Sequence, residues 1–200
     1  MSIITEETEM KLDVGCGGKG SRRDGFIGID IHPRPDGKTA EEYVRMDFVK
    51  DDLQWEENSI DEVIALHIIE HLSREEGVIL LKRCFWLLKE GATMTVTCPD
   101  LMRIATAYVE HDTEYMHLRH EQGKSEKEIW KGKTNADRLN WSMHCEGHKW
   151  SYDYETLLSA CAEAGIPLND VEIMRAGNKY NFRPDHETGI IVRKELCVST

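Results

Sequence analysis

The stretch from Lys11 to Asp30, KLDVGCGGKGSRRDGFIGID, constrains the fold more than any other part of the chain. It predicts a buried strand, a glycine-rich turn and a second strand that ends on Asp30. Glycines at the carboxyl end of a strand let the backbone approach a flat ligand closely, because no Cβ intervenes and a positive φ costs little. A carboxylate at the tip of the next strand lies where it can accept both hydroxyls of a ribose. The stretch therefore indicates a nucleoside-binding α/β fold.

The spacing within this stretch argues against a dinucleotide. A pyrophosphate site needs three spaced glycines that lead into a helix, with the acid about twenty residues further on. Here Asp30 follows Gly17 too closely, and the residues between them lack the length and the apolar periodicity of a helix. An NAD(P)-binding oxidoreductase is therefore the weaker alternative.

The motif Leu12-Asp13-Val14-Gly15-Cys16-Gly17 resembles the first motif of the class I S-adenosylmethionine-dependent methyltransferases. The resemblance continues through a helix at 73–91, a Lys-Glu-Gly turn and a strand at 93–98 that is halted by Pro99. It implies that S-adenosylmethionine is the cofactor and S-adenosylhomocysteine the product. It also implies an enzyme that methylates an O or N atom of a small molecule, such as a sugar or another metabolite. A non-catalytic S-adenosylmethionine-binding module is the alternative.

Strands and helices alternate along the chain, which indicates an α/β domain whose mostly parallel sheet is covered on both faces. We expect strands at 10–14, 26–30, 41–47, 59–66, 93–98, 171–175 and 188–192, and helices at 73–91 and 151–165. The last two strands are joined by a loop, so they predict an antiparallel hairpin at one sheet edge. The resemblance implies the Rossmann-like class I methyltransferase fold, with a seven-stranded mostly parallel sheet, an antiparallel last strand and a helical insertion after strand 5.

The first clear helix has sequence signals at both ends. Ser73 and Glu76 form a capping box at its start, and Gly91 occupies the place where a left-handed residue usually ends a helix. The alternation then breaks down over residues 101–149, which are strongly polar. Long segments of this kind in compact domains tend to be lids or binding segments. We therefore expect one methyltransferase domain over residues 1–200, with 101–149 as a lid on the substrate side, although a solvated helical hairpin is the alternative.

The resemblance implies a cofactor-binding residue near the end of each of the first four strands. Asp30 would hold the ribose, Asp47 would accept from the adenine amino group, and the backbone glycines would contact the methionine part. Carboxylates suit these hydroxyl and amine donors. Strand-end acids are also often merely solvated. The full implied set is Asp13, Gly15, Cys16, Gly17, Asp30, Ile31, Asp47, Phe48, Leu66 and His67. Where the glycine loop departs from the family pattern, Arg22 or Arg23 is a candidate to pair with the cofactor carboxylate, and the alternative is that both are simply solvated.

Two histidine-containing segments supply the candidate catalytic residues, which are His67, Glu70, His71 and His148. A helical turn after the fourth strand would place the first three on one face. Histidine at 148 follows the expected lid and suits a general base, because imidazole titrates near neutral pH. Trp150 and Tyr152 are expected to stack on an acceptor ring or on the sulfonium. The simpler alternative is that His148 and Trp150 only fix the lid to the next helix.

The pattern HxxEH at 67–71 is also the inverted zinc-protease motif, but that motif belongs on a long helix, whereas here a strand runs straight into it. Some methyltransferases of this fold hold a divalent ion on a Glu-x-x-Glu-His turn, and His67 replaces the first glutamate of that turn. We therefore expect no resident metal. A divalent ion with His144 or His148 as a further ligand stays open but is not favoured.

Composition narrows the partners. The formal net charge of −12 would repel phosphate backbones, so a small-molecule acceptor is expected rather than nucleic acid. No signal peptide and no apolar run long enough to span a membrane is evident, and the six cysteines show no paired short spacing. We therefore expect reduced thiols and a cytoplasmic location. Nothing in the sequence indicates the oligomeric state.

Overall fold

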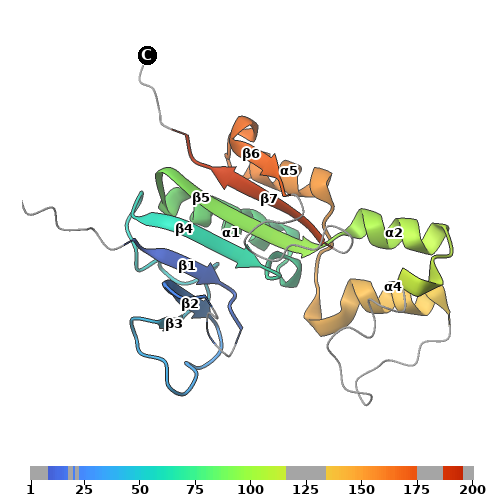
Figure 1. Cartoon of the computed structure of the whole chain (residues 1–200), viewed down its shortest axis with the longest axis horizontal. Helices are drawn as coiled ribbons and strands as arrows, with labels where there is room; N and C mark the ends of the chain where they lie inside the picture. The colour runs from blue at the N-terminus through green and yellow to red at the C-terminus, as the bar shows by residue number, and fades with distance from the viewer. Residues whose placement is uncertain (1–8, 18–19, 21–22, 116–133, 175–186, 196–200) are drawn as a thin grey trace, which may run out of the picture.

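The structure is a computed structural model that describes residues 9–17, 20, 23–115, 134–174 and 187–195. In this part of the chain the strands form a single seven-stranded sheet in the order β3-β2-β1-β4-β5-β7-β6 (Figure 1). The strands are β1 Lys11–Val14, β2 Phe26–Asp30, β3 Tyr43–Arg45, β4 Ile60–Leu66, β5 Leu88–Pro99, β6 Val171–Ile173 and β7 Glu187–Arg193. The pairs among β1 to β5 are parallel, whereas β7 runs antiparallel between β5 and β6. The predicted fold class and the antiparallel terminal hairpin are confirmed.

The helices are α1 Arg74–Leu87, α2 Leu101–Val109, α4 Asn135–His144 and α5 Tyr154–Glu163, with short 3-10 turns η1 Ile69–His71, η2 Cys145–Gly147 and η3 Leu168–Asp170. Figure 1 shows α1 and α5 on the same side of the sheet, where they contact each other. Helices α2 and α4 pack together beyond the carboxyl end of β5 (Figure 1). They provide the helical insertion that was expected after strand 5.

The main core lies between the sheet and the layer formed by α1 and α5. Alternate residues of the central strands enter this core together with apolar residues of both helices; they include Leu12, Val14, Val63, Met94, Val96, Leu81, Leu157 and Ile190. The strand residues between them face the other way. These residues include Asp13, Glu62, Thr95 and Thr97, all of which are buried. The two faces of the sheet therefore differ sharply in polarity.

The expectation of helices on both faces is wrong for the described residues. Right-handed crossovers place helices on opposite faces when the chain moves outward in opposite directions from β1. The crossovers from β1 to β2 and from β2 to β3 span only residues 15–25 and 31–42, and no helix forms in their described parts. Helix α1 connects β4 to β5, and α5 lies in the connection from β5 to β6. Both helices cover the same face of the sheet (Figure 1). The carboxyl end of β1 is therefore followed by a glycine loop rather than by a helix.

The predicted capping box at the start of α1 is confirmed, but the predicted end of this helix is wrong. The Ser73 side chain accepts from the Glu76 backbone, and the Glu76 side chain accepts from the Ser73 backbone. The helix ends at Leu87, and Leu88 already has an extended backbone and pairs with Ile60 in the sheet. Gly91 lies within β5 with a positive φ of 79°. Sheet pairing therefore ends the helix four residues before the glycine that local sequence favours.

The absence of a side chain at Gly77 in α1 leaves room for the fully buried Tyr152. A Cβ built on Gly77 would lie 2.3 Å from the Tyr152 hydroxyl, which is buried and makes no hydrogen bond among the described residues. We expect Gly77→Ala to destabilise the protein by about 2 kcal/mol in urea unfolding, because overpacking exceeds the gain in helix propensity. Removing the hydroxyl in Tyr152→Phe should relieve the clash, so the double variant should be at least as stable as the wild type. If the double variant stays as unstable as Gly77→Ala, this explanation is wrong.

Two further expectations concern cysteines and membranes. Cys16, Cys84, Cys98, Cys145 and Cys161 are all free thiols, and Cys197 lies outside the described residues. None of the described helices is both long enough and apolar enough to cross a bilayer.

Candidate functional site

The glycine loop after β1 folds back onto the end of β2. Gly15, Gly17 and Gly20 all have positive φ values, between 73° and 77°. The backbone amides of Gly15 and Cys16 donate to the Ile29 carbonyl at 2.8 and 3.3 Å. A Cβ built on Gly17 would have no neighbour within 4 Å, so open space lies against the backbone there. The loop can therefore bring main-chain atoms directly against a ligand.

Asp30 joins this loop to the tip of β2. One of its carboxylate oxygens accepts from the Gly17 amide at 2.8 Å, and the other accepts from the His32 amide at 3.0 Å and contacts the His32 ring. The side chain is almost fully buried. Each carboxylate oxygen has about two acceptor directions, so some acceptor capacity remains. The carboxylate is fixed in place and can still accept hydroxyl donors.

The other residues of the glycine loop are also held near charged groups. Burial, reinforced by Asp13 and Asp30, raises the pKa of the Cys16 thiol to about 12, so it stays protonated at neutral pH. The Asp13 carboxylate lies 3.7 Å from the Arg23 guanidinium. Arg22 or Arg23 was predicted to pair with the cofactor carboxylate. Arg23 instead forms an ion pair with Asp13, and Arg22 lies outside the described residues.

A cavity of about 190 Å³ opens between the ends of β1, β2, β3 and β4. Its lining includes the predicted residues Gly15, Asp30, Ile31, Asp47, Phe48 and His71. Ile31 is 60% exposed, whereas Phe48 is buried. The other residues predicted to bind the cofactor are not among its lining residues; they are Asp13, Cys16, Gly17, Leu66 and His67. The cavity thus brings together residues from strand ends that are far apart in sequence.

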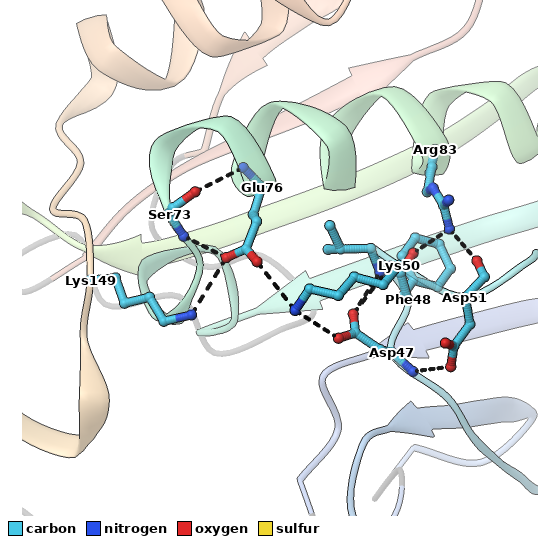
Figure 2. Close-up of polar contacts among 9 residues, drawn as sticks. Asp47, Phe48, Lys50, Asp51, Ser73, Glu76, Arg83 and Lys149 are labelled. Atoms are coloured by element: carbon cyan, nitrogen blue, oxygen red, sulfur yellow. Dashed lines mark hydrogen bonds and ion pairs between the residues drawn. The ribbon is translucent and has the colours of Figure 1, made fainter.

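Asp47 lines the cavity, but its carboxylate already has several donors. It accepts from the backbone amides of Val49 and Lys50 at 3.1 and 3.3 Å and from the Lys50 ammonium at 3.1 Å. Figure 2 shows that Lys50 also reaches Glu76, whose carboxylate lies between Lys50 and Lys149. This ion-pair ladder of Asp47, Lys50, Glu76 and Lys149 borders the cavity. The family resemblance implied an adenine contact for Asp47, but neither it nor the sequence predicted the ladder.

A second polar cluster lies at the end of β4. His67, which has a positive φ of 55°, donates from its two ring nitrogens to Glu70 at 3.1 Å and to Glu187 at 3.0 Å. Burial disfavours the charged ring, but its hydrogen bonds to the two carboxylates outweigh this effect and raise the pKa of His67 to about 9. Its ring is therefore protonated at neutral pH. Such a ring cannot accept a proton, so the geometry favours His67 as a positioning residue.

His71 and His148 face each other beside Glu70. Their rings are in edge contact, with centroids 4.9 Å apart, and Glu70, His71 and His148 offer ligand atoms that all lie within 4.8 Å of one another. The backbone amides of Lys149 and Trp150 donate to the Glu70 carbonyl at 2.8 and 3.3 Å, which pins this segment to η1. Burial lowers the pKa of His148, and His71 adds to this effect while Glu70 opposes it. His148 is therefore neutral at neutral pH.

Not every residue that the sequence placed at the site lies there. Tyr152 is fully buried in the main core and cannot stack on a ligand, whereas Trp150 is 41% exposed. His144, the other metal ligand considered, is exposed at the end of α4. Much of the predicted lid, residues 116–133, lies outside the described residues.

Two contributors had no detectable signal in the sequence. Ile68 packs so closely over Gly15 that a Cβ built there would lie 2.5 Å from it. Glu187, at the start of β7, meets His67 across 120 positions of sequence. No local sequence pattern can encode a contact over this separation, so only the sheet topology reveals it.

Comparison with known proteins supports the fold. No protein-family model and no curated protein matches the sequence. A S-adenosylmethionine-dependent methyltransferase from Archaeoglobus fulgidus aligns over 94% of this chain and 87% of its own, with 18% identity and a TM-score of 0.56. One from Methanosarcina mazei aligns over 96% and 94%, with 15% identity and a TM-score of 0.54. Human N-acetylserotonin methyltransferase, solved with S-adenosylmethionine, aligns over 94% and 48%, with 16% identity and a TM-score of 0.53.

Proposed function

We propose that this chain, which has the class I methyltransferase fold, binds S-adenosylmethionine and transfers its methyl group to an O or N atom of a small molecule. The observation that carries the proposal is the buried Asp30 carboxylate, fixed by the Gly17 amide at the rim of the cavity. A ribose presents two adjacent hydroxyl donors, which match a carboxylate with unused acceptor capacity.

The remaining cavity residues fit the rest of the cofactor. Ile31 and Phe48 supply apolar surface for the adenine, and the Asp47 carboxylate retains one of its roughly four acceptor directions for the adenine amine. Gly17 leaves open space for the methionine part, because a Cβ built there would have no neighbour within 4 Å, whereas Ile68 fills the space beside Gly15. When bound, S-adenosylmethionine supplies an electrophilic methyl group on its sulfonium. The chain's own task is then to hold the acceptor atom in line with that methyl group and to remove its proton.

The proposed group that removes the proton of the acceptor is the cluster of Glu70, His71 and His148. His148 is neutral, half-buried and next to His71, which lines the cavity, so it can take a proton from a hydroxyl or amine. His67 keeps Glu70 oriented through their 3.1 Å hydrogen bond. Residues 101–149 are proposed to form the lid on the substrate side, because α2 and α4 extend beyond the carboxyl ends of the parallel strands (Figure 1).

Titration calorimetry with S-adenosylmethionine, S-adenosylhomocysteine and NAD tests the cofactor. We expect micromolar binding of the two sulfur compounds and none of NAD. Binding of NAD alone would contradict the proposal and favour the oxidoreductase alternative.

Release of S-adenosylhomocysteine with a panel of phenols, hydroxy acids and amines tests turnover. His148→Ala should lower kcat at least about 100-fold while S-adenosylhomocysteine affinity stays within about twofold, because general acid–base groups contribute about 10² to 10⁴. Glu155→Ala, which removes an exposed side chain on α5 away from the cavity and from the proposed lid, is the control and should leave both values unchanged. Equal turnover in His148→Ala and the wild type would remove this residue from the mechanism.

A further inference from the structure

We infer that Glu70, His71 and His148 form a binding site for one divalent transition-metal ion, with Zn²⁺ as the representative ion. The first observation is their convergence. One ligand atom of each lies within 4.8 Å of the other two, although the residues come from η1 and from the segment after η2. The role of the ion in methyl transfer rests on the proposed function, whereas ion binding itself does not.

The second observation is the state of the Glu70 carboxylate. Its Oε1 atom accepts from His67, but its Oε2 atom is buried and has no hydrogen-bond partner among the described residues. Glu70 as a whole is only 2% exposed. A buried acceptor oxygen without a donor is costly, and ordinary folded proteins avoid it. A cation held between Oε2 and the two imidazoles would satisfy this oxygen.

The neighbouring residues fit a metal site in two ways. His67 is excluded as a ligand, because both of its ring nitrogens are engaged by Glu70 and Glu187. It instead orients the carboxylate, as side chains that hydrogen-bond to metal ligands commonly do. The Glu70 carbonyl accepts the backbone amides of Lys149 and Trp150, so the two halves of the site are held together by the main chain.

The ligand types determine the class of ion. Two imidazoles and one carboxylate suit Zn²⁺, Co²⁺, Fe²⁺ or Mn²⁺, whereas Mg²⁺ and Ca²⁺ prefer oxygen ligands. Ligand atoms about 2.0–2.2 Å from an ion lie about 3–3.5 Å apart, so small rotations of the two half-buried imidazoles would close the site. Three protein ligands leave open positions, as in catalytic zinc sites.

The site is placed to act on the acceptor. His71 lines the cavity as well as belonging to the metal cluster, so the ion would lie beside the cavity that is proposed to hold the cofactor. An ion there would polarise an oxygen of the acceptor and favour loss of its proton. With the ion bound, both imidazoles would be ligands, so the proton-accepting role proposed for His148 applies to the ion-free protein. The acceptor class that this chemistry fits is a hydroxyl compound, so the inference narrows the O or N alternative to oxygen.

The test is calorimetry of chelator-treated protein with Zn²⁺, and visible spectroscopy with Co²⁺, alongside Mg²⁺ as a comparison. We expect one Zn²⁺ per chain with a dissociation constant of about 1 µM or lower, and no comparable binding of Mg²⁺. Glu70→Gln, His71→Gln and His148→Gln should each weaken Zn²⁺ binding at least about 10-fold, since changing a residue that merely orients a metal ligand already costs about 10-fold to 100-fold in metal affinity. His71 and His148 are not buried, so their variants should fold even if Glu70→Gln does not.

His144→Gln is the matched control, because this exposed histidine lies close in sequence but outside the cluster. Its Zn²⁺ affinity should equal that of the wild type, which separates a built site from adsorption to the acidic surface. Absence of stoichiometric binding, or equal loss in His144→Gln and His148→Gln, would overturn the inference. S-adenosylhomocysteine titration of the same samples separates the two proposals: its binding without Zn²⁺ binding overturns only the metal site, and the converse overturns only the proposed function.

Discussion

Replacing Asp30 with asparagine is expected to weaken S-adenosylhomocysteine binding about 100-fold. The substitution keeps the size of the side chain, but it removes the charge and presents an amide donor to the backbone amide of Gly17 or of His32. Two ribose hydroxyls would also lose a charged acceptor, and hydrogen bonds to charged groups are worth about 1.5–3 kcal/mol each. A combined loss of about 3 kcal/mol corresponds to roughly 100-fold in the dissociation constant.

The control for this experiment is Asp36→Asn. Asp36 is exposed in the loop after β2 and does not line the cavity, so Asp36→Asn makes the same change of charge away from the site. Its affinity for S-adenosylhomocysteine should match the wild type, and thermal unfolding should show that both variants are folded. An Asp30→Asn protein that binds within threefold of the wild type would show that this carboxylate does not hold the ribose.

The second large effect is expected for Gly15→Ala. Alanine at a φ of +74° is strained by about 1–2 kcal/mol, and its Cβ would overlap Ile68, whose atoms lie 2.5–2.8 Å from that position. Overpacking adds about 1–3 kcal/mol. We therefore expect a loss of about 3 kcal/mol in urea unfolding. We also expect loss of detectable S-adenosylhomocysteine binding, because Ile68 precedes the turn that carries Glu70 and His71.

Gly37→Ala separates the two causes. Gly37 also has a positive φ, of 83°, but a Cβ there would have no neighbour within 4 Å, so only the backbone strain of about 1–2 kcal/mol should appear. Adding Ile68→Ala to Gly15→Ala should recover part of the stability by removing the overlap. If Gly15→Ala costs no more than Gly37→Ala, contact with Ile68 has been overstated.

The sequence predicted the sheet well because its signals are local. The second strand, Phe26–Asp30, has the predicted bounds, and the Ser73–Glu76 capping box lies where expected. Both depend on residues within a few positions of each other. The end of α1 was wrong because Leu88 pairs with Ile60, a contact that local propensity does not encode.

The candidate site was predicted less completely, for the same physical reason. Glycine motifs and strand-end acids mark the rim of the cavity, so Gly15 and Asp30 were identified. The residues that determine the charge and the burial of each side chain come from segments distant in sequence. His67 was expected to act in proton transfer, but Glu187 turns it into a cation, and Tyr152 was expected at the ligand but is in the core. Residue type alone does not reveal such neighbours.

The position of β7 has a consequence for how the protein acquires its site during synthesis. β7 lies between β5 and β6, so β6 has no partner in the sheet until residues 187–193 have been made. The same strand delivers Glu187 to His67. A nascent chain that stops before this strand therefore lacks both the closing edge of the sheet and the Glu187 carboxylate that pairs with His67. Pairing across such long sequence separations also slows folding, so the contacts of His67 with Glu70 and Glu187 should be among the last parts of the molecule to form.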